Sequence, residues 1–188
     1  MLFYLAPMEG ITGYIVRNAY AHYFPYIDKY FTPFIPAAKK MSKKIKRDLA
    51  AENNGQIRLV PQLIGNRADE FLMMIRQLEE LGFTSVNLNF GCPSGTVVSK
   101  RKGAGFLADP KELEMLLEEV LENSPLAVSV KTRVGIKDPD EWEALCGVYA
   151  KFPLEELIIH PRLQNDYYSG TPRMETFARA LEQIHVPL

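Results

Sequence analysis

The sequence contains few of the residues that hold small disulfide-bonded or metal-binding proteins together. It has two cysteines, Cys92 and Cys146, and three histidines in 188 residues. The two cysteines lie far apart, neither belongs to a CxxC pair, and no histidine-rich segment accompanies them. This pattern disfavours both a disulfide scaffold and a zinc site. The sequence therefore predicts no bound metal.

Long apolar runs are also missing. No stretch of about 18 apolar residues occurs, which argues against a membrane-spanning helix. The first ten residues, MLFYLAPMEG, lack the basic region and the apolar stretch of a signal peptide. We therefore expect a cytoplasmic protein without a membrane partner, whose mature chain begins near Met1.

Neither sign of charge is in excess. The formal net charge is −1, so the whole chain has no general attraction for nucleic acid, and any such attraction must come from local patches. With 47% hydrophobic and 24% charged residues, the composition is that of a globular protein. No low-complexity linker divides the chain, and we expect one domain over residues 1–188.

Short apolar runs alternate with segments of helical periodicity. Apolar residues recur at the spacing i, i+3, i+4, i+7 in two segments, residues 71–78 and 113–120, which predicts two helices that each bury one face. The predicted strands are residues 2–6, 29–32, 59–63, 85–89, 127–131 and 156–160. Repeated β-then-α units with short connections indicate parallel strands, in a doubly wound sheet or in a barrel.

Helix boundaries have clear local signals. The segments DPKE at 109–112 and DPDE at 138–141 each offer an aspartate cap, a proline for the first helical position and an acid for the first turn. Gly82 is expected to end the helix that precedes it.

Polar residues at the ends of the predicted strands distinguish a barrel from an open sheet. In a parallel barrel the carboxyl ends of all strands converge on the face where ligands bind. The polar residues in question are Gln62, Asn87, Asn89, Lys131 and His160. The first strand is followed by APMEGITG, which lacks the GxGxxG of a dinucleotide fold. We therefore predict an α/β fold of the (β/α)8 TIM-barrel type. The sequence accommodates about six βα units, whereas a full barrel has eight in about 250 residues, so we expect a truncated barrel.

Several motifs now combine into a family resemblance. In order along the chain they are APMEGIT, PQLIGN, VNLNFGCP, GAGFLADP, VKTRVGI and IIHPRLQNDYYSGTP. In order and spacing they resemble the tRNA-dihydrouridine synthases, over essentially the whole chain. The resemblance implies an FMN enzyme that reduces the C5–C6 double bond of specific tRNA uridines and uses NADPH as the reductant. It also implies a seventh and eighth strand with a phosphate site and a C-terminal helical tRNA-binding domain, all absent from these 188 residues.

Cys92 is the candidate catalytic acid. Reduction of an activated C=C bond needs a hydride at one carbon and a proton at the other, from opposite faces of the base. A thiol with a pKa of about 8.5 is still protonated at neutral pH and can donate that proton. The resemblance places the hydride at C6 and the Cys92 proton at C5. The alternative for any free cysteine is a buried core position, which we expect for Cys146 within ALCGVYA.

The resemblance also assigns a flavin site. Lys131 would stabilise negative charge near N1 and O2 of the ring, unless a barrel carboxylate neutralises it. His160 would lie near the flavin and the uracil edge. The amides of Gln62 and Asn89 both donate and accept hydrogen bonds, as a pyrimidine edge requires. Pro7 and Met8 would contact the ring system, although a core role suits Met8 almost equally well.

Two basic segments are candidates for binding RNA phosphates. KKMSKKIKR, at 39–47, follows the second predicted strand, and KRK, at 100–102, follows the fourth. The predicted RNA-binding residues are Lys39, Lys40, Lys43, Lys44, Lys100, Arg101, Lys102 and Arg162. Clustered cations attract phosphates irrespective of base sequence, but a solvated helix face has the same composition. Tyr167 and Tyr168 are candidates for stacking on an unstacked uridine.

Two other functions fit part of this pattern. A small-molecule flavin oxidoreductase similar to dihydroorotate dehydrogenases would use the same barrel and an equivalent cysteine, but not the basic segments. A truncated, inactive barrel is the third possibility. Its first and sixth strands would have open edges, which favour self-association.

Overall fold

The computed structural model describes residues 1–55 and 57–188. The strands are β1 (Tyr4–Leu5), β2 (Lys29–Phe31), β3 (Ile35–Pro36), β4 (Leu59–Val60), β5 (Gln62–Ile64), β6 (Ser85–Phe90), β7 (Ala127–Arg133) and β8 (Leu157–His160). The α-helices are α1 (Tyr14–Tyr23), α2 (Lys43–Leu49), α3 (Ala68–Glu80), α4 (Gly95–Val98), α5 (Pro110–Asn123), α6 (Glu141–Tyr149) and α7 (Met174–Gln183). Three short 3₁₀ helices are η1 (Ala51–Asn53), η2 (Gly103–Ala108) and η3 (Gln164–Asp166).

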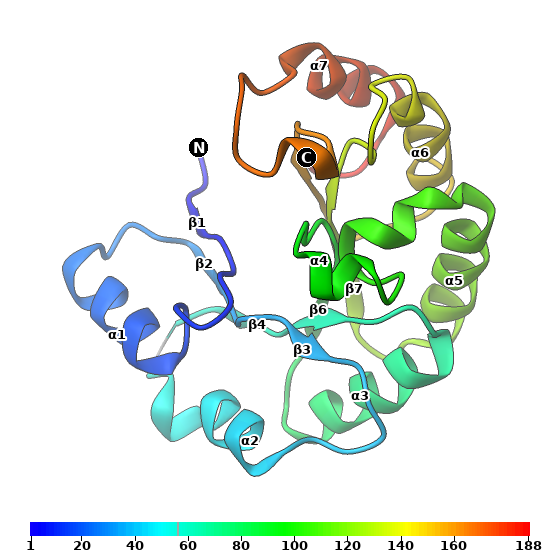
Figure 1. The fold of residues 1–188 in the computed structure, drawn as a ribbon. Helices are drawn as coiled ribbons and strands as arrows, with labels where there is room; N and C mark the ends of the chain where they lie inside the picture. Colours follow the sequence, from blue (N-terminus) through cyan, green and yellow to red (C-terminus); the bar gives the residue numbers. More distant parts are fainter. Residues whose placement is uncertain (56) are drawn as a thin grey trace.

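All strand pairs in the described residues are parallel, in the orders β1-β2-β4 and β3-β5-β6-β7-β8. The chain passes directly from β2 towards β3 and from β4 through Pro61 to β5, so the two ladders form one curved wall. The larger helices follow one another around its outside (Figure 1). This is a partial (β/α) barrel of six βα units, as the sequence predicts.

Two of the six strands are interrupted. The predicted strand 59–63 is divided into β4 and β5 at Pro61, since proline has no N–H to donate to a ladder. The predicted strand near 29–32 ends at Phe31, and the chain then adds β3, which the sequence analysis did not predict. Each half pairs with a different neighbour, so these interruptions let the wall curve.

The core lies between the barrel wall and the helices outside it. Helices α3 and α5 bury the apolar faces predicted from their periodicity, including Phe71 and Leu117, both fully buried. Phe90 of β6 stacks on Phe106 with ring centroids 5.6 Å apart and meets Phe71 edge-on at 6.5 Å. Burial of each large apolar side chain contributes about 1.5–3 kcal/mol. Cys146 is 1% exposed within α6 and belongs to this core.

The helix boundaries confirm two predictions and correct a third. Helix α5 begins at Pro110, and the Asp109 carboxylate accepts from two backbone N–H groups. Gly82 follows α3 with φ of 87°, a conformation that glycine adopts readily. The prediction of a helix starting at Pro139 was wrong, because α6 begins at Glu141. The Glu141 carboxylate instead accepts the N–H groups of residues 136–138 and stabilises a turn before the helix.

A buried ion pair joins the first and last parts of the wall. Lys29 Nζ of β2 lies 2.7 Å from Glu156 Oε1, just before β8, and Tyr4 of β1 donates to the other carboxylate oxygen. On the outer side of β8, the Leu157 N–H donates to the carbonyl of Pro187 at 2.9 Å. The last residues thus cover part of this strand edge, and self-association through open edges stays a prediction. No helix in the described part of the chain is long and apolar enough to cross a membrane.

Candidate active site

A cavity of about 530 Å³ lies at the carboxyl ends of the barrel strands. Its volume is within the range of about 300–1,000 Å³ that is usual for small-molecule sites. The cavity brings together all seven predicted cofactor-binding and catalytic residues, which are Pro7, Met8, Gln62, Asn89, Cys92, Lys131 and His160. Met8 is 53% exposed, so it lines the cavity and is not a core residue.

Strand register sets the layers of this site. In β6 and β7, Asn89 is paired with Lys131, and in β7 and β8, Arg133 is paired with His160. Alternate residues of a strand point to the same side, so Ser129, Lys131 and Arg133 face the barrel interior together. Arg133 was missed in the sequence analysis, and this two-residue period is the signal that would have found it.

A chain of amides connects the barrel interior to the cysteine loop. The Gln62 side chain is completely buried; it donates to Asn87 at 2.8 Å and accepts from Asn89 Nδ2 at 2.8 Å. Asn89 Oδ1 then accepts the backbone N–H groups of Gly91 and Cys92 at 3.0 and 2.9 Å. Most of the hydrogen-bonding capacity of the two amides is thus used within the protein, and each keeps one N–H for a ligand.

The loop that carries Cys92 is held from several sides. Arg133 Nε donates to the Gly91 carbonyl at 2.9 Å, and the Ala104 N–H donates to the Cys92 carbonyl at 3.0 Å. Gly103, with φ of 54°, allows this approach, because a Cβ there would lie 2.8 Å from the Cys92 carbonyl oxygen. These contacts leave the loop little freedom and give the thiol a defined position.

The cavity keeps the thiol protonated. Cys92 is half-buried, and its removal from water raises the pKa of the thiol above its usual value, since a thiolate loses solvation there. Glu9, which also lines the cavity, acts in the same direction by like-charge repulsion. A raised pKa favours the protonated thiol over the thiolate at neutral pH.

The same cavity holds two cations that lack a carboxylate partner among the described residues. In residues 1–55 and 57–188, no carboxylate oxygen lies within 4.0 Å of Lys131 or Arg133. Burial, with a further contribution from Arg133, lowers the pKa of Lys131 to about 8. Arg133 is 1% exposed and lies under the Tyr168 ring, 5.4 Å from its centroid. The neutralised lysine considered from the sequence is thus not found, and the site favours an electron-rich ligand.

His160 is neutral in this surrounding. Burial, then the charges of Arg133, Lys131 and Arg162, lower its pKa to about 4. Arg162 Nη1 lies 3.0 Å from His160 Nε2, and since arginine can only donate, Nε2 accepts and the ring proton is on Nδ1. The ring therefore offers one N–H as a donor.

Tyr167 and Tyr168 belong to the wall of the site, and Arg162 supports the loop that follows them. Besides His160, Arg162 donates to the carbonyls of Ser169 and Gly170 at 3.2 and 3.0 Å, so it holds this loop. Tyr167 and Tyr168 line the cavity and are 50% and 74% exposed. Tyr167 has φ of 50°, a conformation that side chains rarely adopt and that is often found at functional sites.

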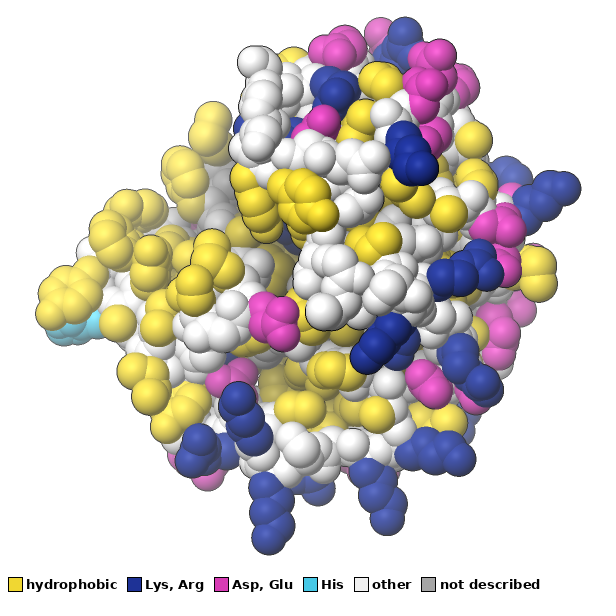
Figure 2. Space-filling view, in the orientation of Figure 1, with side chains coloured by type: hydrophobic (Ala, Val, Ile, Leu, Met, Phe, Trp, Pro, Cys, Tyr) yellow, Lys and Arg dark blue, Asp and Glu magenta, His cyan; other side chains and the backbone are white. Residues whose placement is uncertain are grey.

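Both basic segments contact the β5–α3 unit. Gln77, in the last turn of α3, donates to the Lys39 carbonyl, and Asn66, between β5 and α3, donates to the Lys100 carbonyl. Figure 2 shows lysine and arginine side chains along the lower and right-hand rim of this face. Arg101 pairs with Glu112 at 2.8 Å, whereas Lys39, Lys40, Lys43, Lys44, Lys100 and Lys102 make no ion pair within the described residues.

The fold and the cavity define a barrel protein with a ligand site at the carboxyl ends of its parallel strands. The model of the dihydrouridine synthase (Dus) family matches residues 4–188, and the chain belongs to this family.

Curated relatives agree with this assignment. The chain is 30% identical over 163 residues to a probable tRNA-dihydrouridine synthase 2 of Bacillus subtilis, covering 85% of this chain and 50% of that protein. It is 29% identical over 195 residues to a tRNA-dihydrouridine(16) synthase of Pseudomonas putida, covering 98% and 59%. A tRNA-dihydrouridine(20/20a) synthase of Vibrio parahaemolyticus is 34% identical over 121 residues, covering 62% and 37%. The chain thus spans about half the length of the curated relatives it matches.

Proposed function

We propose that this chain forms the uridine-reducing site of a tRNA-dihydrouridine synthase, which uses FMN and NADPH to convert specific tRNA uridines to 5,6-dihydrouridine. The observation that carries the proposal is one cavity lined by a half-buried thiol with a raised pKa, Cys92, and by two cations, Lys131 and Arg133, without carboxylate partners among the described residues. A proton donor and a site for an electron-rich ring are the two parts that reduction of a C=C bond needs.

The residues present fit the ring of a flavin. Lys131 would hold the pyrimidine edge, where negative charge accumulates, and the remaining N–H groups of Gln62 and Asn89 would donate to ring acceptors. The Nδ1–H of neutral His160 is one further donor. Pro7 and Met8 would cover the apolar ring surface. When bound, the flavin supplies the hydride.

The chain itself supplies the proton for the reaction, from the Cys92 thiol. A thiol with a raised pKa holds its proton at neutral pH until the adjacent uracil carbon becomes basic, and then transfers it to C5. The rigid loop keeps the donor on one face of the base, so that hydride and proton arrive from opposite sides. Tyr167 and Tyr168 can stack against a uridine turned out of the RNA.

The two basic segments favour tRNA over a free small molecule as the substrate. Lys39, Lys40, Lys43 and Lys44 lie just before and at the start of α2, and Lys100 and Lys102 lie between the cysteine loop and α5, without carboxylate partners among the described residues. Phosphates would bind along these two segments. Arg101 and Arg162 are weaker candidates, because their guanidinium groups already contact Glu112 and the 169–170 carbonyls.

Stopped-flow absorbance tests the acid. The flavin-loaded protein is reduced with NADPH and mixed with unmodified tRNA, and reoxidation of the flavin is followed. We expect Cys92→Ala to slow reoxidation by about 10²–10⁴-fold, the usual contribution of a general acid, while reduction by NADPH keeps its rate. Cys146→Ala, at the buried core cysteine, is the matched control and should leave both rates unchanged.

Three results would contradict the proposal. If tRNA reoxidises the flavin of Cys92→Ala at the parent rate, Cys92 is not the acid. If a free pyrimidine reoxidises the flavin as fast as tRNA does, the protein is instead a small-molecule oxidoreductase. A protein that binds no flavin when FMN is added would be an inactive barrel.

Salt dependence tests the basic segments. Replacing Lys39, Lys40 and Lys43 with glutamine should weaken tRNA binding and lower the slope of log affinity against log salt by about one for each lost phosphate contact. Lys111→Gln, an exposed lysine on α5, is the control. Equal slopes in all proteins would show that the segments are only a solvated surface.

A further inference from the structure

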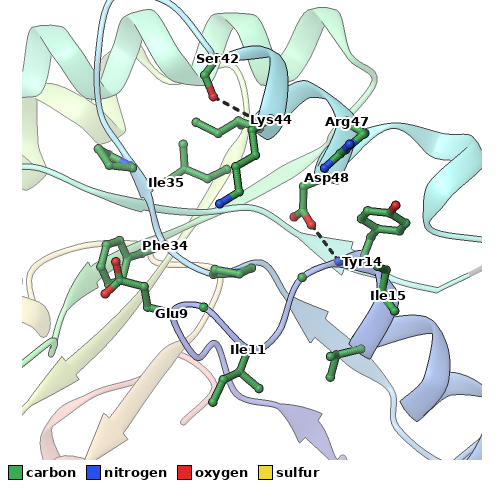
Figure 3. Close-up of a pocket in the computed structure, with 16 residues that line it drawn as sticks. Glu9, Ile11, Tyr14, Ile15, Phe34, Ile35, Ser42, Lys44, Arg47 and Asp48 are labelled. Atoms are coloured by element: carbon green, nitrogen blue, oxygen red, sulfur yellow. Dashed lines mark hydrogen bonds between the residues drawn. The ribbon is translucent and has the colours of Figure 1, made fainter.

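A second cavity, of about 590 Å³, lies beside the first one. It is bounded by the β1–α1 connection, by the segment from Pro33 to Pro36 and by helix α2 (Figure 3). Its walls are mainly apolar and include Ile11, Tyr14 and Ile15, of which Ile11 and Ile15 are more than half exposed. Apolar and aromatic walls open to solvent are suited to a planar ring that arrives from solution.

The second cavity adjoins the candidate active site. Glu9 and Phe34 line both cavities, so a ligand in one lies against the same two residues as a ligand in the other. Nothing in the reduction of a uridine itself uses the second cavity. It therefore has room for a group that is attached to the uridine.

The charges of the second cavity are divided between its rim and its far wall. Lys44 and Arg47 extend from α2, and in Figure 3 the Lys44 ammonium points into the cavity. Neither has a carboxylate within 4.0 Å in the part of the chain that the structure describes.

The nearest acid on the same helix is not available to these cations. Asp48 accepts from the Tyr14 N–H at 2.8 Å and pairs with Arg17 at 3.0 Å. Cations at the rim can bind a phosphate, and Glu9, at the inner wall, can accept from the N–H groups of a base.

We propose that the second cavity binds the nucleotide that is next to the target uridine in the RNA, with its base against Tyr14 and its phosphate at Lys44 and Arg47. This inference rests on the proposed function and extends it from one nucleotide to two. It makes the site selective for a dinucleotide step in an unstacked strand. Free uridine, which lacks the neighbour, would then bind weakly.

The cation pattern favours RNA over the adenosine end of NADPH as the occupant. Lys44 and Arg47 continue a row of cations at 39–47 that extends well past the cavity, as a polyanion would need. A single dinucleotide has its phosphates in one place and would leave most of this row unused.

Fluorescence anisotropy with short RNAs tests the proposal. The probe is a seven-nucleotide RNA with one central uridine, compared with three versions in which the central base, its 5′ neighbour or its 3′ neighbour is replaced by an abasic site. We expect loss of one of the two neighbours to weaken binding about tenfold, as for other bases stacked on aromatic side chains. Tyr14→Ala should abolish that difference.

Matched variants separate a local effect from a general one. Tyr23→Ala is at the other end of the same helix, 73% exposed and outside the cavity, and should keep the tenfold difference. Lys44→Gln should lower the slope of log affinity against log salt by about one, whereas Lys111→Gln should not.

Each other outcome overturns the inference. If neither neighbouring base affects binding, or if Tyr14→Ala keeps the difference, the nucleotide binds elsewhere. If Tyr14→Ala weakens NADPH binding and not RNA binding, the cavity belongs to the reductant. If the RNA with an abasic site at its central position binds as tightly as the parent RNA, the proposed function itself is contradicted. This failure can be told apart from failure of the present inference, because the inference concerns the neighbouring positions of the probe.

Discussion

Two kinds of cation lie in the interior of the protein, most of them buried and Lys131 partly so. At the amino ends of the strands, Lys29 is 2.7 Å from Glu156. Between α1 and α2, Arg17 is 3.0 Å from Asp48. In the cavity at the other end of the strands, Lys131 and Arg133 have no carboxylate within 4.0 Å in residues 1–55 and 57–188. The first kind has a carboxylate partner, and the second has none in the part of the chain that the structure describes.

The difference separates structural charges from functional ones. A buried cation with a carboxylate partner has part of its desolvation cost offset within the folded protein. A buried cation without one makes folding less favourable and is expected where a ligand provides the opposite charge. Lys131 shows the cost directly, since burial lowers its pKa from 10.5 to about 8.

The largest effect should follow from breaking the paired charge. Glu156→Gln leaves Lys29, which is 3% exposed, without a counter-charge, and we expect the free energy of unfolding to fall by about 3 kcal/mol. Urea unfolding at pH 7 measures it. The double variant Lys29→Met, Glu156→Gln should recover part of the loss, and a loss below 1 kcal/mol in the single variant would mean that the pair is not structural.

Removing the unpaired cation should have the opposite sign. Lys131→Met should raise the free energy of unfolding at pH 7 by about 1–2 kcal/mol, while flavin affinity falls. Between pH 8 and 10.5 the unfolded chain binds more protons at this residue than the folded chain, so the parent gains stability as pH rises through this window. Lys131→Met should lack that gain, and Lys111→Met should retain it. If Lys131→Met is less stable than the parent, Lys131 stabilises the fold, as Lys29 does.

A smaller effect is expected at the histidine beside these cations. The pKa of His160 is lowered from 6.5 to about 4, so between these values the unfolded chain binds more protons than the folded chain. Stability should therefore fall by about 1 kcal/mol as the pH drops from 6.5 to 4, and His160→Asn should lose less over this range. Urea midpoints of both proteins at several pH values measure the difference. Parallel curves would show that His160 does not experience the neighbouring cations.

The smallest effect should come from an exposed pair. Arg101 and Glu112 are 2.8 Å apart, but both side chains are largely in water. Glu112→Gln, the same carboxylate-to-amide change as at Glu156, should alter the free energy of unfolding by about 0.5 kcal/mol or less, and salt should reduce even that. An effect comparable to that of Glu156→Gln would remove the distinction between buried and exposed pairs.

Local patterns in the sequence predicted much of the fold. The apolar period of α3 and α5, the Asp109 cap and the Gly82 stop act over a few residues, and the structure contains all of them. The division of one strand at Pro61 and the later start of α6 were not predicted. The division at Pro61 follows from the missing N–H of proline and from the pairing of β4 and β5 with different strands. The start of α6 depends on competing local bonds of the Glu141 carboxylate.

The sequence alone determined which residues would meet, because parallel strands place their carboxyl ends on one face whatever the details of packing. Cys92, Lys131 and His160 could therefore be assigned to one cavity before their distances were known. Only the tertiary structure decided what each of them has as a neighbour. The surroundings of Lys131, which has no carboxylate within 4.0 Å in the described residues, and the second cavity beside the first depend on contacts between segments far apart in the chain. The bonds of Arg162 to the 169–170 carbonyls depend on how the loop after β8 folds back.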